Sequence, residues 1–414
     1  MLLTSQLWNH SSHEPCQPEH PRHEESGGRA GTKMSDGNNG RGLRPDGGTA
    51  RLVLLIAALS ACVSAPGEPQ ARATQRVQPT TSTFPIKPVA NPPKPYQALA
   101  VDQRETPPPA LVSVVRNLGQ SFNGKVGIAV RRIGSDWTVA WNGNLLFPQQ
   151  SVSKLWVSMT VLDAVDRGKF RLSDTTTITR KDLTLFHQPS AGLVGSSGWT
   201  TSYSDLMRRA MMNSDNTAND TLLRSVGGPE AVRSYLARRF IKDVRFGPGE
   251  RLLQATAAGL EWRQDYSIGR NFYAARARLP IEARKRALDN YLASPPDGAA
   301  PSAIVHALAK LKEGDMLSPA SSQLLMSIMS EAKTGPQRIK GGVPAGWRYM
   351  HKTGTGQVLG ARSTGYNDVG IMTAPDGTSY AVAVMIGSTT EPIPARWELM
   401  QAVAKAVAAN HEKR

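Results

Sequence analysis

The stretch SVSKLWVSMTVLDAV, residues 151–165, decides the fold because it predicts a helix that is buried on nearly every side. Apolar residues occupy positions all round the helix from Ser153 to Val165, and a helix of that kind lies in the centre of a domain. Gly168 is a plausible helix stop. At 414 residues, the chain is long enough to bury a large core around this helix.

Strand-like segments lie on both sides of the central helix in the sequence. They alternate apolar and polar residues or are rich in β-branched residues, and Gly-Ser-Asp joins the first two. The predicted strands span residues 125–133, 137–143, 347–356, 363–374 and 379–388, and predicted helices at 110–122 and 395–411 bracket them. We therefore expect an α/β (α+β) fold, with an antiparallel sheet made from both termini, flanking helices and an inserted all-helical half.

The N-terminal region carries an export pattern. In RLVLLIAALSACVSAPG, residues 51–67, a basic flank precedes an apolar run too short to cross a bilayer, and small residues follow. The end of the run, Leu-Ser-Ala-Cys62, resembles the lipobox of bacterial lipoproteins, whose Cys is lipidated; an ordinary cleaved signal with a free Cys is the alternative. Met34 would start a signal of normal size within residues 1–61. We therefore predict export to the bacterial periplasm and a lipid anchor on Cys62.

The composition divides residues 62–414 into a tether and a folded domain. Residues 62–107 are rich in Pro, Thr, Gln and Ala without a periodic apolar face, which predicts an extended tether. Residues 108–414 form the folded domain. The formal charge of +16 is interpreted as a solvated basic face or as attraction to an anionic cell envelope. Because export separates the chain from nucleic acid, we expect no nucleic-acid partner; we also expect a monomer without a metal or cofactor.

Three short motifs occur in a fixed order along the domain. Residues 151–154 are S-x-x-K, residues 214–216 are S-D-N, and residues 352–354 are K-T-G. S-x-x-K occurs once more at 330–333, and K-T-G occurs once more at 333–335. No S-D-N follows the second S-x-x-K. Only the motif at Ser151 therefore has both partners downstream.

This order resembles the signature of class A β-lactamases and penicillin-binding proteins. The flanks FPQQSVSKLW (147–156), NSDNTANDTLLRSVGGPEAV (213–232) and GVPAGWRYMHKTGTG (342–356) also resemble class A β-lactamases. The resemblance implies an enzyme of antibiotic resistance that opens a β-lactam ring through a Ser151 acyl-enzyme and then releases it with water.

The chemistry of these residue types agrees with that interpretation. A serine hydroxyl needs a base beside it, and Lys154 shares a helix face with Ser151. Ser214 can relay a proton towards the leaving nitrogen, and Asn216 can hydrogen-bond a substrate amide. Lys352 would place positive charge beside a substrate carboxylate and Ser214.

The residue after K-T-G separates the two copies of that motif. By resemblance, the backbone N–H of this residue and that of Ser151 bind the oxyanion. The first copy is followed by Pro336, which has no N–H, and the second by Thr355. We therefore predict that Lys352, Thr353 and Gly354 form the functional copy, together with Thr355.

In class A β-lactamases, a loop called the Ω loop supplies a glutamate that activates water. This glutamate is the first residue of the sequence pattern E-x-x-L-N. Here Glu250 begins E-x-x-L-Q and is the predicted base, with Glu261, Glu282 or no base at all as alternatives. Pro248 stands where the family carries an Arg, whose ion-pair partner would be Asp297.

The region after Glu250, about 255–297, is about thirty residues longer than the family norm and should have its own structure. Its segment 279–292 predicts a helix with Ile281, Leu288, Tyr291 and Leu292 on one face. Arg362, ten residues beyond Lys352, resembles the family's carboxylate-binding Arg, although the spacing is one residue longer.

Two other functions remain open from the sequence. One is a DD-peptidase-like, penicillin-binding enzyme that acts on peptidoglycan and deacylates slowly because its Ω loop is altered. The other is a non-catalytic envelope-binding protein on the same scaffold.

Overall fold

The computed structural model describes residues 106–411. The predicted signal, the lipidation site at Cys62 and almost all of the predicted tether lie outside these residues, so they stay predictions. Among the described residues, no helix combines the length and the apolar composition that a membrane span requires.

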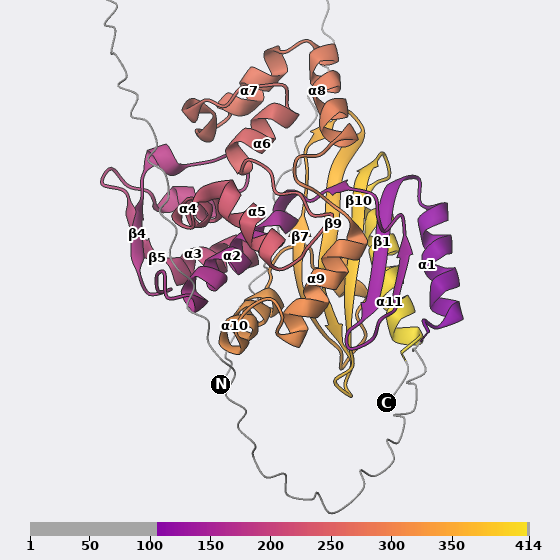
Figure 1. Ribbon diagram of the computed structural model, residues 1–414. Coiled ribbons are helices and arrows are strands. Elements are labelled where there is room, and N and C mark those ends of the chain that lie inside the picture. The colour runs from indigo at the N-terminus through magenta and orange to yellow at the C-terminus, as the bar shows by residue number, and fades with distance from the viewer. Residues whose placement is uncertain (1–105, 412–414) are drawn as a thin grey trace, which may run out of the picture. The chain divides into compact units, whose positions relative to one another are not determined.

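The centre of the fold is an antiparallel sheet built from both ends of the domain, as expected (Figure 1). Its strand order is β2-β1-β10-β9-β7, and β8 pairs with the start of β9. The strands are β1 (Gly124–Arg132), β2 (Thr138–Trp141), β7 (Arg348–Gly354), β8 (Val358–Leu359), β9 (Arg362–Thr373) and β10 (Ser379–Thr389). Two short pairs lie outside it, β3 (Phe147–Pro148) with β6 (Gly298–Ala299) and β4 (Thr175–Ile178) with β5 (Trp199–Ser202).

Helices cover both faces of the sheet. On one face, α1 (Pro109–Ser121) and α11 (Ile393–Ala409) share a hydrophobic core with the sheet. On the other face, α9 (Pro301–Glu313) packs on β1 and β10 and leads into the helical half. That half contains α2 (Lys154–Asp166), α3 (Tyr203–Met212), α4 (Asn216–Ser225), α5 (Gly228–Arg238) and α10 (Pro319–Ser330). The predicted inserted all-helical half is confirmed.

Helix α2 is the buried helix that the opening sequence pattern predicts. Every residue from Lys154 to Ala164 is buried, and α3, α4, α5 and α10 pack around it. Trp156, Met159 and Leu162 have no exposed surface, and each contributes roughly 1.5–3 kcal/mol through burial. Gly168 follows with φ of 68°, a conformation that glycine adopts without strain.

The long region after Glu250 is structured. It contains α6 (Glu250–Ala257), the 3-10 helix η4 (Gln264–Ser267), α7 (Asn271–Arg278) and α8 (Ile281–Ala293). The predicted face of α8 is buried at Leu288, Tyr291 and Leu292, whereas Ile281 is exposed. Arg276 of α7 donates to Val358 O of β8 at 3.0 Å. The region therefore spans from the helical half to the edge of the sheet, above the ends of the strands in Figure 1.

Candidate active site

Ser151 and Lys154 lie at the junction of a 3-10 helix with α2. The 3-10 helix η1 covers Gln150–Ser153, and α2 begins at Lys154. The sequence predicts Ser151 at the N-terminus of the α-helix; in the structure it lies on the 3-10 turn just before that helix. A 3-10 helix aligns residues i and i+3, so the expected pairing survives, and Lys154 Nζ donates to Ser151 Oγ at 2.9 Å.

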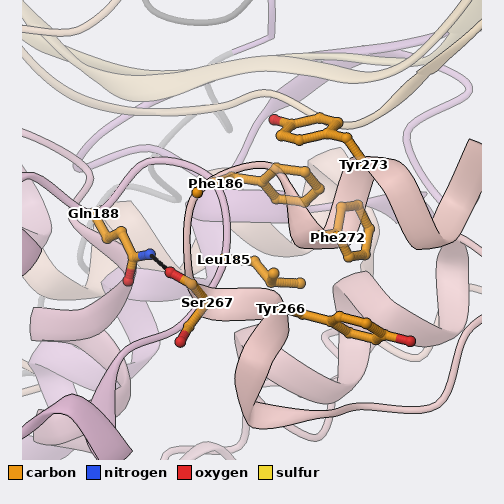
Figure 2. Close-up of a pocket in the computed structure, with 8 residues that line it drawn as sticks. Leu185, Phe186, Gln188, Tyr266, Ser267, Phe272 and Tyr273 are labelled. Atoms are coloured by element: carbon orange, nitrogen blue, oxygen red, sulfur yellow. Dashed lines mark hydrogen bonds between the residues drawn. The ribbon is translucent and has the colours of Figure 1, made fainter.

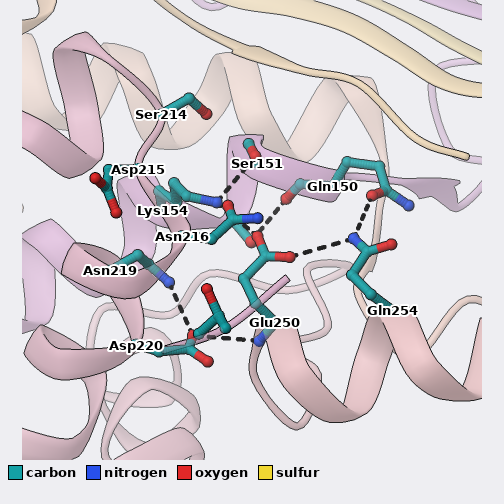
Figure 3. Close-up of polar contacts among 12 residues, drawn as sticks. Gln150, Ser151, Lys154, Ser214, Asp215, Asn216, Asn219, Asp220, Glu250 and Gln254 are labelled. Atoms are coloured by element: carbon teal, nitrogen blue, oxygen red, sulfur yellow. Dashed lines mark hydrogen bonds and ion pairs between the residues drawn. The ribbon is translucent and has the colours of Figure 1, made fainter. Parts of the chain in front are cut away.

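The turn before the nucleophile is held from the inserted region (Figure 3). Gln150 has φ of 53°, which a non-glycine residue rarely adopts. Its backbone N donates to Asp297 Oδ2 at 2.8 Å, and its side chain contacts Tyr291 and Gln254. Tyr291 OH donates to Asp297 Oδ1 at 3.0 Å. Burial raises the pKa of Asp297 to about 6.

Glu250 is the first residue of α6 and is 5% exposed. Its Oε1 accepts from Lys154 Nζ at 2.5 Å, and its Oε2 accepts from Gln254 Nε2 at 3.2 Å. The rival glutamates lie elsewhere: Glu261 is exposed, and Glu282 pairs with a lysine of its own helix. Of the three carboxylates that the sequence offered, Glu250 is the one in contact with Lys154.

A second buried carboxyl group, Asp220, lies beside Glu250. Its Oδ1 accepts from the backbone N of Glu250 at 3.2 Å. Burial raises the pKa of Asp220, and the neighbouring charge of Glu250 raises it further. Sequence reasoning missed this residue, although it lies only four positions after the S-D-N motif.

Ser214 and Lys352 meet on the other side of the nucleophile. Lys352, fully buried on β7, donates from Nζ to Ser214 Oγ at 3.0 Å. Burial lowers the pKa of Lys352 well below its ordinary value, and the charges of Lys154 and Arg338 lower it further. The structure therefore gathers Ser151, Lys154, Glu250, Ser214 and Lys352, as predicted from the motifs.

Asn216 opens α4 and faces the segment between β4 and β5. Its Nδ2 donates to Leu185 O at 2.9 Å, and its backbone N donates to His187 O at 2.9 Å. Its Oδ1 is buried and has no hydrogen-bond partner within the part of the chain that the structure describes. An unpartnered acceptor of this kind suits a substrate N–H.

Strand β7 docks closely against the nucleophile turn. A Cβ on Gly354 would lie 2.3 Å from Gln149 O, so this position requires glycine. Asn367 of β9 donates from Nδ2 to Gln149 O at 3.0 Å and holds the same turn. The close approach packs the end of β7, which carries Thr353, against the turn that carries Ser151.

Two arginines near this strand have different surroundings. The predicted Arg362 is half exposed and pairs with Asp289 of α8 at 2.5 Å, away from the gathered residues. Arg338 is buried and donates to Gly354 O at 3.0 Å and to Thr355 Oγ1 at 2.7 Å. Sequence reasoning missed Arg338, because its contacts join positions 16 and 17 residues apart across a loop.

Comparisons with known proteins show which family this chain belongs to. A model of the β-lactamase enzyme family matches residues 110–411. The extended-spectrum β-lactamase PER-1 of Pseudomonas aeruginosa is 30% identical over 59% of this chain and 69% of its own length. The β-lactamase VEB-1 of the same organism is 24% identical over 70% of this chain and 87% of its own length.

Solved structures show the same fold. A β-lactamase from Chitinophaga pinensis aligns with a TM-score of 0.59 at 26% identity, over 72% of this chain and 99% of its own. The TLA-3 extended-spectrum β-lactamase aligns with a TM-score of 0.59 at 23% identity, over 72% and 97%. The chain therefore belongs to the β-lactamase enzyme family and has the fold of its class A members.

Proposed function

We propose that this protein hydrolyses β-lactams through an acyl-enzyme on Ser151, and that water activated by Glu250 releases the product. One observation carries the proposal: Lys154 Nζ contacts both Ser151 Oγ and Glu250 Oε1. A nucleophile, an amine and a buried carboxylate are thereby joined in one chain of hydrogen bonds. Acyl transfer with hydrolytic release needs a nucleophile and a general base, and these groups can supply both.

Acylation uses the hydroxyl, the paired base and the proton relay. Ser151 Oγ attacks the lactam carbonyl while its proton passes to the Lys154–Glu250 pair, forming a tetrahedral oxyanion. The backbone N–H groups of Ser151 and Thr355 stabilise that oxyanion. The C–N bond then breaks, and the ring nitrogen takes a proton through Ser214. The result is an ester on Ser151 and a ring-opened amine.

Deacylation uses Glu250 again. The carboxylate takes a proton from a water molecule, the water oxygen attacks the ester carbonyl, and the C–O bond to Ser151 breaks. Ser151 recovers a proton, and the product leaves as a ring-opened acid. Asp220 holds the backbone N of Glu250 and so positions the carboxylate.

The cations at the edge of β7 suit the carboxylate that β-lactam antibiotics carry. Lys352 and Arg338 supply the charge, and the hydroxyls of Thr353 and Thr355 can donate hydrogen bonds. The carboxylate-binding role of Arg362 stays a prediction. Arg338→Ala and Arg362→Ala, compared by KM for the same penicillin, distinguish the two arginines.

The test replaces Glu250 by Gln and follows a chromogenic cephalosporin. We expect turnover to fall by a factor of about 10² or more, with the acyl-enzyme on Ser151 accumulating in the mass spectrum. Glu282→Gln is the matched control, because that glutamate is exposed and pairs with Lys285. An unchanged acyl-enzyme lifetime in Glu250→Gln would remove Glu250 from this role.

The same assay separates the other functions. A wild-type protein that forms a long-lived adduct without turnover would be a DD-peptidase-like enzyme, which acts on peptidoglycan. A protein that forms no adduct on Ser151 with a fluorescent penicillin would be a non-catalytic binding protein.

We further propose that the protein is exported to the periplasm as a monomer and is anchored there by a lipid on Cys62. The basic flank, the short apolar run and the Leu-Ser-Ala-Cys62 sequence support this. In bacteria fed a labelled fatty acid, the wild type should be labelled and sediment with membranes, and Cys62→Ser should do neither. Labelling of the Cys62→Ser variant would contradict the anchor.

A further inference from the structure

The helices that follow α6 are packed against their neighbours. Phe186 meets Phe272 of α7 edge-on, with ring centroids 5.1 Å apart, and Gln188 Nε2 donates to Ser267 O of η4 at 3.1 Å (Figure 2). Farther along the sequence, α8 shares a hydrophobic cluster with α6. Tyr291 of α8 therefore projects from a packed part of the molecule, where its position is fixed.

Tyr291 and Asp297 together hold the residue that precedes the nucleophile. Tyr291 is 7% exposed, and its OH donates to Asp297 Oδ1 at 3.0 Å and accepts from Gln150 Nε2 at 2.5 Å. The other oxygen of Asp297 accepts from the backbone N of Gln150 at 2.8 Å. The positive φ of Gln150 is a conformation that persists only where the surroundings hold it. These contacts fix both the backbone and the side chain of Gln150.

Two further glutamines extend these contacts to Glu250. Gln254 Nε2 donates to Gln150 Oε1 at 2.8 Å and to Glu250 Oε2 at 3.2 Å (Figure 3). Gln357 Nε2 donates to Gln254 Oε1 at 3.1 Å. Because Gln357 bonds the oxygen of the Gln254 amide, the NH₂ group of that amide is turned towards Gln150 and Glu250. A buried hydrogen-bond network therefore connects α8 with the carboxylate of Glu250.

The direction of each hydrogen bond in this network follows from the carboxylates at its two ends. An ionised carboxylate only accepts hydrogen bonds, so the Tyr291 O–H points to Asp297. For the same reason, a Gln254 N–H points to Glu250. The oxygen of Tyr291 then accepts from Gln150 Nε2, which turns Gln150 Oε1 towards Gln254. Without the tyrosine hydroxyl, the Gln150 amide loses the acceptor that fixes its orientation, and its NH₂ group can face that of Gln254.

We propose that Tyr291 is a positioning residue for deacylation. It acts through Gln150 and Gln254 to hold the carboxylate of Glu250. This role rests on the proposed function and adds a residue outside the catalytic motifs to its second step. Glu250 Oε1 contacts Lys154 directly, whereas Oε2 is held by Gln254. Loss of the network would therefore leave the Lys154–Glu250 pair of acylation in place and free the carboxylate to turn away from the attacking water.

The test replaces Tyr291 by Phe, which keeps the ring and removes the hydroxyl. The rate constant of deacylation should fall about fivefold, because one hydrogen bond of the network is lost, while that of acylation should change by less than about twofold. Stopped-flow kinetics with a chromogenic cephalosporin measure both rate constants, and mass spectrometry of the acylated protein gives the fraction of active enzyme. Equal losses in the two steps, or no loss in deacylation, would overturn the proposal.

A second buried tyrosine provides the matched control. Tyr235 is fully buried, and its hydroxyl donates to Met316 O at 3.1 Å. Tyr235→Phe should therefore leave both rate constants unchanged, although it also removes a buried hydroxyl.

A double substitution tests the route from Tyr291 to Glu250. Gln254→Leu breaks the network between the two, so adding Tyr291→Phe to it should lower the rate constant of deacylation no further. A structural effect of the lost hydroxyl would instead add to the loss caused by Gln254→Leu. Losses that add would contradict the positioning role.

A measurement on the free protein keeps this role separate from hydrolysis. The side-chain amide signal of Gln254, identified by its absence in Gln254→Leu, should move in the NMR spectrum of Tyr291→Phe and stay in place in Tyr235→Phe. A signal that does not move in Tyr291→Phe would overturn the positioning role even if β-lactams are hydrolysed. If no β-lactam acylates the wild type, the hydrolase proposal fails, while the NMR spectrum still decides whether Tyr291 orients Gln254.

Discussion

The two copies of K-T-G have the same side chains and different surroundings. Lys352 is fully buried at the end of β7 and bonds to Ser214, whereas Lys333 is exposed in the turn after α10. The second copy continues into Thr355, and the first continues into Pro336. Burial and the residue that follows therefore distinguish the two copies, because the three letters alone are identical.

The lysines of the two K-T-G copies should differ most in their contribution to activity. Lys352→Met should lower kcat/KM by a factor of about 10²–10³, because a preorganised charge beside Ser214 and the substrate carboxylate is lost. Methionine keeps most of the buried volume, so the fold should survive. Lys333→Met is the control and should change kcat/KM by less than about twofold. Steady-state kinetics on one penicillin measure kcat/KM for both variants. Similar losses of kcat/KM in the two variants would show that the two copies do not differ in function.

The residue after each motif offers the next test. Thr355→Pro removes the proposed oxyanion donor and should lower kcat by a factor of about 10². Pro336→Thr makes the reverse change at the first copy and should leave kcat unchanged. A Thr355→Pro variant that keeps its kcat, with circular dichroism showing a native fold, would place the oxyanion hole elsewhere.

Local patterns in the sequence predicted much of this site. The apolar periodicity of 153–165 predicted α2, and the order of the motifs predicted that Ser151, Lys154, Ser214 and Lys352 would meet. The first signal is short-range, because a helix face is encoded within a few residues, whereas the second comes from the resemblance of three distant motifs to a known family.

Contacts between residues far apart in the sequence have no local pattern that predicts them. Arg338 reaches Gly354 and Thr355 across a loop, and Gln150 Nε2 bonds Tyr291 OH, 141 residues away in the sequence. Neither contact has a periodicity or a spacing that one sequence reveals. The inserted region was recognised by its length, but its contact with β8 depends on tertiary packing.

The buried Lys352 should also titrate differently from an exposed lysine. Burial holds its pKa well below the ordinary 10.5, so the ammonium group is lost at a lower pH than in an exposed lysine. Activity that depends on this charge should fall on the alkaline side. Lys352→Arg keeps its charge and should move the alkaline limb of the kcat/KM profile to higher pH. An unmoved limb would assign that limb to another group.

The lowered pKa of Lys352 also makes the stability of the fold depend on pH. Between the lowered pKa and 10.5, the unfolded chain binds more protons at this position than the folded chain does. The free energy of unfolding contributed by Lys352 therefore rises with pH across this window. Urea unfolding at several pH values should show this slope in the wild type and a smaller one in Lys352→Met.

The smallest expected effect concerns a contact between the two copies. Thr334 of the first K-T-G and Thr353 of the second share a hydrogen bond of 2.7 Å between their hydroxyls. The first copy therefore orients the hydroxyl of Thr353 in the second copy. Thr334→Val removes the bond while keeping the shape, and should lower kcat/KM by about fivefold, since one such bond contributes about 1 kcal/mol.

A second threonine pair provides the control for that change. Thr177 and Thr200 share a hydroxyl bond of 2.8 Å on β4 and β5, away from the catalytic residues. Thr200→Val should therefore leave kcat/KM unchanged. If Thr334→Val raised KM for substrates that carry the carboxylate while kcat stayed constant, the first copy would act on substrate binding through Thr353. An effect as small as that of Thr200→Val would make the contact between the copies purely structural.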